Sequence, residues 1–266
     1  YALYKRALAD GAGELGETNF VLRGMAGGLS GGTVASMMEV MHTASTDPDA
    51  RRLMSDPYTL TTDRAAEPDL GHQSDTPWRR GRDIAEELDG IWTGAFMMGA
   101  PNARIVRRSN ALMGWAYGPK FRYAENMSLG SSVVAPVAAA MGTAANAAVL
   151  ELGSRYFDKL PRKLLERVAP KPGSGPSERA RDNGHYRVET YTTTSSGARY
   201  RATMAQQGDP GYKATSVLLG ESGLALAFDR DALSELRGVL TPAASLGDAL
   251  LARFPAAGVT METERL

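Results

Sequence analysis

The chain has 266 residues, enough for one large domain or two small ones, and its 30 basic and 30 acidic residues give a formal net charge of zero. A balanced charge provides no overall basic field, which argues against nucleic acid as the main partner. The absence of cysteine excludes disulfides, thiol catalysis and thiolate metal sites. The three histidines form neither an HxH nor an HExxH pattern, which argues against a zinc hydrolase. No basic-then-apolar leader is visible, so the expected location is the cytoplasm.

The first ten residues, Tyr1 to Asp10, have the apolar spacing of a helix that stops at Gly11–Gly13. This helix has neither an initial methionine nor a capping residue. Because helices usually begin at a cap, we expect upstream sequence to be missing from the chain.

A glycine-rich turn follows the first predicted strand. The apolar run in Asn19–Met25 predicts a buried strand, and the helical spacing of the apolar residues after Thr33 predicts a helix. The turn between them has neither the GxGxxG pattern of dinucleotide sites nor the GK[ST] ending of phosphate loops. It is either a tight strand-to-helix connection or a turn whose free amides face a ligand. The candidate ligand-facing residues are Ser30, Gly31, Gly32 and Thr33.

A cluster of arginines is predicted on one helix in the middle of the chain. A strand is expected at Pro57–Thr62 and a loop over residues 63–82, before Pro101 begins a helix that ends near Gly114. Three arginines lie three and four residues apart on this helix and therefore share a face: Arg104, Arg107 and Arg108. Together with Asn102 and Asn110 they could bind a carboxylate or phosphate, or they could form a solvated face paired with Glu86 or Glu87.

The segment Met127–Leu150 contains no charged residue. It is long enough to span a bilayer, but it is built mainly of Ala, Gly, Ser and Thr and contains Pro136. We expect a close-packed buried helix or a dimer interface. A helix lying on lipid is the alternative, supported by the basic residues of the amphipathic segment Leu152–Val168.

The remaining elements complete an α+β pattern. A connection at 170–183 precedes a predicted hairpin of strands 186–194 and 198–206, and then come helices at 212–228 and 243–254 and a strand at 259–262. With the predicted strands at 19–25, 57–62 and 121–126, we expect a mixed, mostly antiparallel sheet with helices packed on one face.

Several sequence blocks resemble those of the saccharopine dehydrogenase-like oxidoreductases, and in particular the branch called trans-acting enoyl reductases. They occur in the family's order and cover most of the chain: Gly27–Thr33, Pro101–Leu112, Ala116–Tyr123, Gly208–Ala227 and Gly238–Phe254. The resemblance implies an N-terminal Rossmann domain that nothing in these residues matches. Residues 1–266 would then be the C-terminal substrate and dimerisation domain of a two-domain enzyme.

The resemblance also implies what the intact protein does. It would be an NADPH-dependent reductase of a lipid- or polyketide-like acyl substrate, a homodimer whose nucleotide is held mainly by the missing domain. The substrate- or cofactor-facing candidates on this chain are then Ser30, Gly31, Gly32, Thr33, Arg107, Arg108, Asn110 and Tyr123. Two alternatives remain open: a non-catalytic protein of the same fold associated with lipid or peripherally with a membrane, and a dimerisation module.

Overall fold

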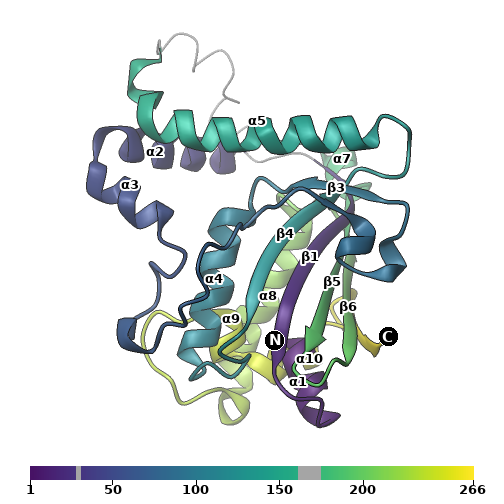
Figure 1. Ribbon diagram of the computed structural model, residues 1–266. Coiled ribbons are helices and arrows are strands. Elements are labelled where there is room, and N and C mark those ends of the chain that lie inside the picture. The colour runs from purple at the N-terminus through teal and green to yellow at the C-terminus, as the bar shows by residue number, and fades with distance from the viewer. Residues whose placement is uncertain (28–30, 161–174) are drawn as a thin grey trace.

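A computed structural model describes residues 1–27, 31–160 and 175–266 (Figure 1). The α-helices are α1 (Ala2–Ala9), α2 (Gly31–Thr46), α3 (Pro48–Ser55), α4 (Gly99–Leu112), α5 (Ala135–Tyr156), α7 (Glu178–Asp182), α8 (Lys213–Phe228), α9 (Pro242–Ser245) and α10 (Gly247–Arg253). The strands are β1 (Leu15–Ala26), β2 (Arg79–Arg80), β3 (Trp92–Ala95), β4 (Arg122–Ser128), β5 (His185–Thr194), β6 (Arg199–Gln207) and β7 (Val259–Arg265). Short 3-10 turns include η2 (Gly81–Asp83), η3 (Glu86–Leu88) and η4 (Phe157–Lys159).

The strands form one sheet in the order β2-β3-β4-β1-β5-β6-β7. Only the central pair of β1 and β4 is parallel, with Asn19 beside Ala124, and the other described pairs are antiparallel. The predicted hairpin is confirmed as β5 and β6, joined at the turn that contains Gly197. The α+β fold with a mostly antiparallel sheet is therefore confirmed.

Each face of the sheet is covered by different parts of the chain. On one face, α1 and α4 pack against alternate strand residues and enclose the larger core, which includes Leu3, Ala103, Tyr123 and Tyr200. On the other face, the segment containing η2 and η3 places buried residues against Val21 and Tyr191. Alternation of side chains along a strand explains this division, since neighbours such as Phe20 and Val21 point to opposite faces.

The predicted strand at Pro57–Thr62 is wrong. The Asp56 carboxylate accepts a 2.8 Å bond from the Tyr58 amide, and the Thr61 amide donates to the Tyr58 carbonyl at 2.8 Å. These bonds close consecutive tight turns, and an aspartate before a proline favours such turns over a sheet ladder. The predicted helix at 243–254 is likewise divided into α9 and α10, with Gly247 in the left-handed region at a φ of 46°.

The prediction that Met127–Leu150 forms a buried helix is also wrong. The helix forms as α5, but Ala135, Ala139 and Ser154 are its only buried residues. Its inner side packs on β3 and α2, where the Ala95 amide donates a 2.9 Å bond to the Thr143 hydroxyl. The expected amphipathic segment Leu152–Val168 is described only as far as residue 160, and the rest of it lies outside the described residues.

By length and composition, the region Ala135–Lys159 is the one helix in the described part of the chain that could cross a membrane, with a mean hydropathy of 1.3 over its best window. Only 11% of that window is buried. A single helix of this kind is weak evidence for a membrane span, and the fold places α5 across one end of the sheet, packed on β3 (Figure 1).

Candidate functional site

Two of the three predicted arginines on α4 bind one half-buried carboxylate. The Arg104 Nη1 lies 2.9 Å from Asp75 Oδ2, and the Arg107 Nη2 lies 2.7 Å from Asp75 Oδ1. Arg107 is 2% exposed and also donates to the Tyr123 carbonyl at 3.3 Å. Asp75 is thus the acidic partner of this helix, whereas Glu86 and Glu87 pair with Arg199 from the hairpin. Asp75 lies in a loop, 29 residues before Arg104, so the helical spacing of the arginines could not identify it as their partner.

Arg108 has a different role from its two neighbours. Its guanidinium donates to the Leu60 carbonyl and, at 2.6 Å, to the Val239 carbonyl. It therefore joins α4 to the turns at 57–62 and to the segment before α9. The Arg108 guanidinium thus binds backbone carbonyls of two other segments and links them to α4.

A buried glutamate that sequence reasoning missed lies beside the arginine cluster. Glu125 is 2% exposed and accepts bonds from the Tyr123 hydroxyl at 2.7 Å and from Asn102 Nδ2 at 2.9 Å. Burial raises the pKa of Glu125 to about 7, although the two hydrogen bonds act in the opposite direction. Near neutral pH this carboxyl can hold or release a proton, and the phenol of Tyr123 is its direct neighbour. Alternation along β4 could have revealed the pair, since Tyr123 and Glu125 are two residues apart in a predicted strand.

The described candidate residues fall into two groups at different ends of the sheet. Arg107 and Tyr123 meet, and Asn110 lies on the same helix, where its side chain accepts a 2.8 Å bond from the Tyr117 amide. Tyr123 is paired in register with Thr18, whereas Gly31 follows the far end of β1. At a rise of about 3.3 Å per residue, β1 runs roughly 26 Å from Thr18 to Ala26. Within the described residues, the structure does not bring the start of α2 and the arginine helix into one site.

The glycine turn packs closely at its first residue. A Cβ on Gly27 would lie 2.7 Å from the Asp209 Cβ, and Gly27 has a φ of 142°. Asp209 is fully buried and accepts bonds from the amides of Tyr212 and Lys213 at 3.1 and 3.0 Å, at the start of α8. The contact favours a tight connection at Gly27, and the nearby carboxylate disfavours a phosphate there. Gly31, Gly32 and Thr33 form the first turn of α2, and Ser30 lies outside the described residues.

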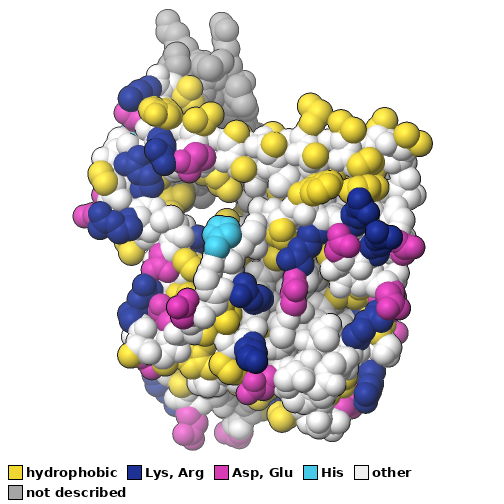
Figure 2. All heavy atoms as spheres, viewed as in Figure 1, with side chains coloured by type: hydrophobic (Ala, Val, Ile, Leu, Met, Phe, Trp, Pro, Cys, Tyr) yellow, Lys and Arg dark blue, Asp and Glu magenta, His cyan; other side chains and the backbone are white. Residues whose placement is uncertain are grey.

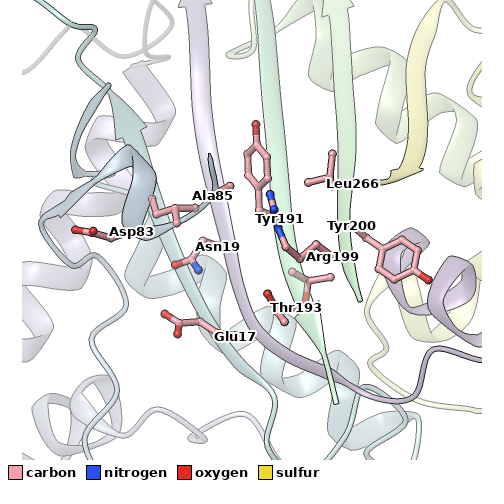
Figure 3. A pocket seen from close by; sticks show the side chains of 11 residues that line it. Glu17, Asn19, Asp83, Ala85, Tyr191, Thr193, Arg199, Tyr200 and Leu266 are labelled. Carbon is pink, nitrogen blue, oxygen red and sulfur yellow. The ribbon is translucent and has the colours of Figure 1, made fainter. Parts of the chain in front are cut away.

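A small polar hollow lies on the sheet face opposite α1 and α4 (Figure 3). It encloses about 110 Å³ between β1, β5 and the segment before η3, and its polar walls include Glu17, Asn19, Thr193 and Arg199. A second hollow of about 140 Å³ is bounded by Arg80, Arg82 and Trp92 at the β2 edge. Both are smaller than the ~300–1,000 Å³ of a typical small-molecule site.

These residues do not fit a nicotinamide dinucleotide. Each of the two hollows is too small for one, and at Gly27 the turn after β1 packs against the Cβ of Asp209. Within the described ranges, no group of three or more His, Asp or Glu residues could hold a metal ion.

Comparison with known proteins gives relatives along the whole chain. It is 65% identical to the Mycobacterium tuberculosis protein named "Putative trans-acting enoyl reductase Rv2449c" over 266 residues, covering 100% of this chain and 64% of that protein. It is 63% identical over 265 residues to the protein named "Trans-acting enoyl reductase" from Mycobacterium ulcerans, and 61% identical over 267 residues to one of that name from Mycobacterium bovis. These alignments cover 63% and 64% of the relatives and 99% and 100% of this chain.

No family model matches the sequence, and no solved structure matches it. The relatives at 61–65% identity nevertheless match the chain from end to end. The chain spans 64% of the length of the first of them. Over its whole length, this chain is homologous to part of the proteins named trans-acting enoyl reductase.

Proposed function

We propose that the chain is the substrate and dimerisation domain of an enoyl reductase of the saccharopine dehydrogenase-like family. The intact protein would use NADPH to reduce a lipid- or polyketide-like acyl substrate, with the nucleotide held mainly by a Rossmann domain outside these 266 residues. One observation carries the proposal: the identity of 61–65% to proteins named trans-acting enoyl reductase extends over the whole chain.

The geometry supports a substrate and nucleotide site that is built from two domains. The hollows of about 110 and 140 Å³ are too small for a dinucleotide or a long acyl chain. The chain also spans 64% of the first relative, which leaves room in such a protein for a second domain. This domain would then contribute one wall of the substrate site, and the site would be complete only in the intact protein.

Within this domain, we propose the polar hollow as part of the substrate wall. Asn19 accepts a 3.2 Å bond from Arg79 on its Oδ1, and Arg199 extends from β6 towards the same hollow (Figure 3). Such groups fix the orientation of a polar head, whereas an acyl chain needs apolar surface from elsewhere. Gly31, Gly32 and Thr33 remain candidates for contact with ligand at the far end of β1.

The test is an assay of the intact protein with NADPH and a 2-enoyl thioester of a long fatty acid. NADPH consumption that depends on the thioester, with formation of the saturated thioester in mass spectrometry, is the expected result. Consumption of NADPH without a saturated product, or no consumption with thioesters of several chain lengths, would reject the enoyl reductase assignment. The Asn19→Asp variant should raise KM if the hollow orients substrate.

The second candidate function is a lipid-associated protein without catalytic activity. The exposure of α5 favours it, because apolar residues on this helix and just before it are 56–95% exposed: Val133, Val134, Val137, Met141, Val149 and Leu152. Alanine is abundant in Met127–Leu150, and Leu129 and Leu150 are its only Leu, Ile or Phe residues. This composition makes insertion in lipid weak. Binding of the intact protein to phosphatidylcholine vesicles in the absence of reductase activity would favour this candidate.

A further inference from the structure

The outer face of α5 has no partner among the residues that the structure describes. Its inner side faces β3 and α2 (Figure 1). Its outer side carries the exposed apolar residues. Figure 2 shows hydrophobic side chains gathered along this edge of the molecule. Met141 is 68% exposed and Val137 is 59% exposed, which is unusual for apolar residues in the middle of a helix.

The exposed residues form a seam with the spacing used for helix pairing. Val134, Ala138, Met141, Ala145, Ala148 and Leu152 are all exposed, and their intervals of four, three, four, three and four residues keep them on one side of the helix. Apolar residues at alternating intervals of three and four are typical of helices that pack side by side. We call these six residues the α5 seam.

The α5 seam is symmetric about Thr143. Val134 and Leu152 lie nine residues before and after Thr143, Ala138 and Ala148 lie five before and after, and Met141 and Ala145 lie two before and after. If two copies of α5 lie antiparallel around Thr143, each residue of a pair meets the other member of that pair. Large residues then meet at both ends, small residues meet between them, and each Met141 meets an alanine.

Exposed residues beside the α5 seam are also arranged symmetrically about Thr143. Val137 and Val149 lie six residues on either side of Thr143 and are 59% and 61% exposed. Gly142 has open space where a Cβ would lie, so a neighbouring helix can approach the backbone closely at the centre. A helix-interior glycine costs roughly 1 kcal/mol relative to alanine, and no contact of the described chain explains this one.

The absence of charge on the α5 seam is compatible with packing against a second copy. A two-fold interface places the same surface on both sides, so a charge near its centre would lie close to an equal charge. No charge occurs from Met127 to Leu150, and the first charged residues, Glu151 and Arg155, form an ion pair at 2.6 Å within the helix. In the antiparallel arrangement these two residues lie near the uncharged start of the other α5.

We propose that two copies of this chain associate through antiparallel packing of their α5 seams. With 22 residues at 1.5 Å each, α5 runs about 33 Å, and its whole exposed side would be covered by its copy. This proposal rests on the dimerisation role proposed above and assigns it to α5. It requires no enzymatic activity, so its failure would leave the reductase assignment unaffected.

Sedimentation of the 266-residue chain tests the proposal. The wild-type chain should have twice its monomer mass of 28.4 kDa. Met141→Glu and Ala145→Lys should each be monomeric, because each places like charge within the seam of both copies. A mixture of the two variants should recover the dimer, since antiparallel packing brings Glu at 141 to Lys at 145. Ala147→Glu, on an exposed residue of α5 outside the seam, is the matched control and should stay dimeric.

Disulfide formation tests the orientation, because the native chain has no cysteine. Ala138→Cys and Ala148→Cys should cross-link when mixed and should not cross-link alone. Cross-linking of either variant with itself would indicate parallel packing and overturn the arrangement. A monomeric wild-type chain that sediments with phosphatidylcholine vesicles would overturn the proposal in favour of a lipid surface, and a dimer unaffected by Met141→Glu would place the contact elsewhere.

Discussion

The guanidinium of Arg107 and the carboxylate of Asp75 form an ion pair at 2.7 Å inside the protein, with side chains 2% and 14% exposed. Asp75 also binds Arg104 at 2.9 Å, and its carbonyl accepts a 2.8 Å bond from the Glu125 amide. The pair thus joins α4 to β4 through a loop that has no regular structure of its own.

Removal of this ion pair should destabilise the fold strongly. In Arg107→Met the Asp75 carboxylate loses its most buried partner but keeps Arg104 at 2.9 Å. We therefore expect a loss near the lower end of the about 3–5 kcal/mol that breaking a buried pair costs. Urea denaturation would measure the loss. Arg52→Met is the control, because its pair with Asp49 has side chains 78% and 80% exposed, and an exposed pair contributes about 0–1 kcal/mol. Equal effects of the two substitutions would contradict the prediction.

Stability should depend on pH through Glu125. Its pKa is raised to about 7 in the folded protein from an ordinary value of 4.5, so the folded chain holds a proton in this range that the unfolded chain has released. The stabilisation is therefore complete below pH 4.5 and is lost as the pH rises through 7. With about 1.4 kcal/mol for each pKa unit, the loss is on the order of 3 kcal/mol.

The Glu125→Gln variant should remove this pH dependence. Its free energy of unfolding, compared with that of the wild type across the same pH range, should vary much less between weakly acidic and weakly alkaline buffer. Glu264→Gln serves as the control, since the Glu264 side chain is 52% exposed. A wild-type curve and a Glu125→Gln curve that run parallel would show that Glu125 titrates normally.

Arg108→Ala in the intact protein should lower the melting temperature and leave turnover and substrate affinity unchanged. The guanidinium binds the carbonyls of Leu60 and Val239, and these contacts stabilise the chain rather than open a ligand site. Steady-state kinetics and thermal unfolding of the same preparation measure both effects. A loss of turnover at unchanged melting temperature would instead assign Arg108 to a ligand-binding cleft.

Two glycine substitutions should have opposite effects on stability. In Gly184→Ala the new Cβ would lie 2.5 Å from the backbone of Asp209, so the turn must shift and the fold should lose stability. In Gly220→Ala, inside α8, the new Cβ meets open space. Alanine in a helix interior should then stabilise by about 0.5–1 kcal/mol. Chemical denaturation of both variants gives the comparison, and a stable Gly184→Ala protein would contradict the close packing around Asp209.

The 266-residue chain alone should bind NADPH weakly or not at all. It carries no dinucleotide fingerprint, and Asp209 lies against Gly27 at the start of the glycine turn. Isothermal titration calorimetry with the purified chain is the measurement. Micromolar affinity would show that this domain holds the nucleotide by itself.

Local sequence patterns determined much of the secondary structure. Alternation of apolar and polar residues predicted the β5–β6 hairpin, and helical spacing placed Arg104, Arg107 and Arg108 on one helix. These features depend on interactions between residues close together in the chain, which is why the sequence by itself was sufficient.

Only the tertiary structure decided what these residues contact. The partner of Arg107 is Asp75, in a loop far from it in sequence, and the raised pKa of Glu125 arises from burial beneath α4. Likewise, the composition of α5 suited both a buried and an exposed helix, and its exposure depends on how β3 and α2 cover one side of it. Burial and long-range pairing are properties of the assembled chain, so spacing along the sequence could not determine them.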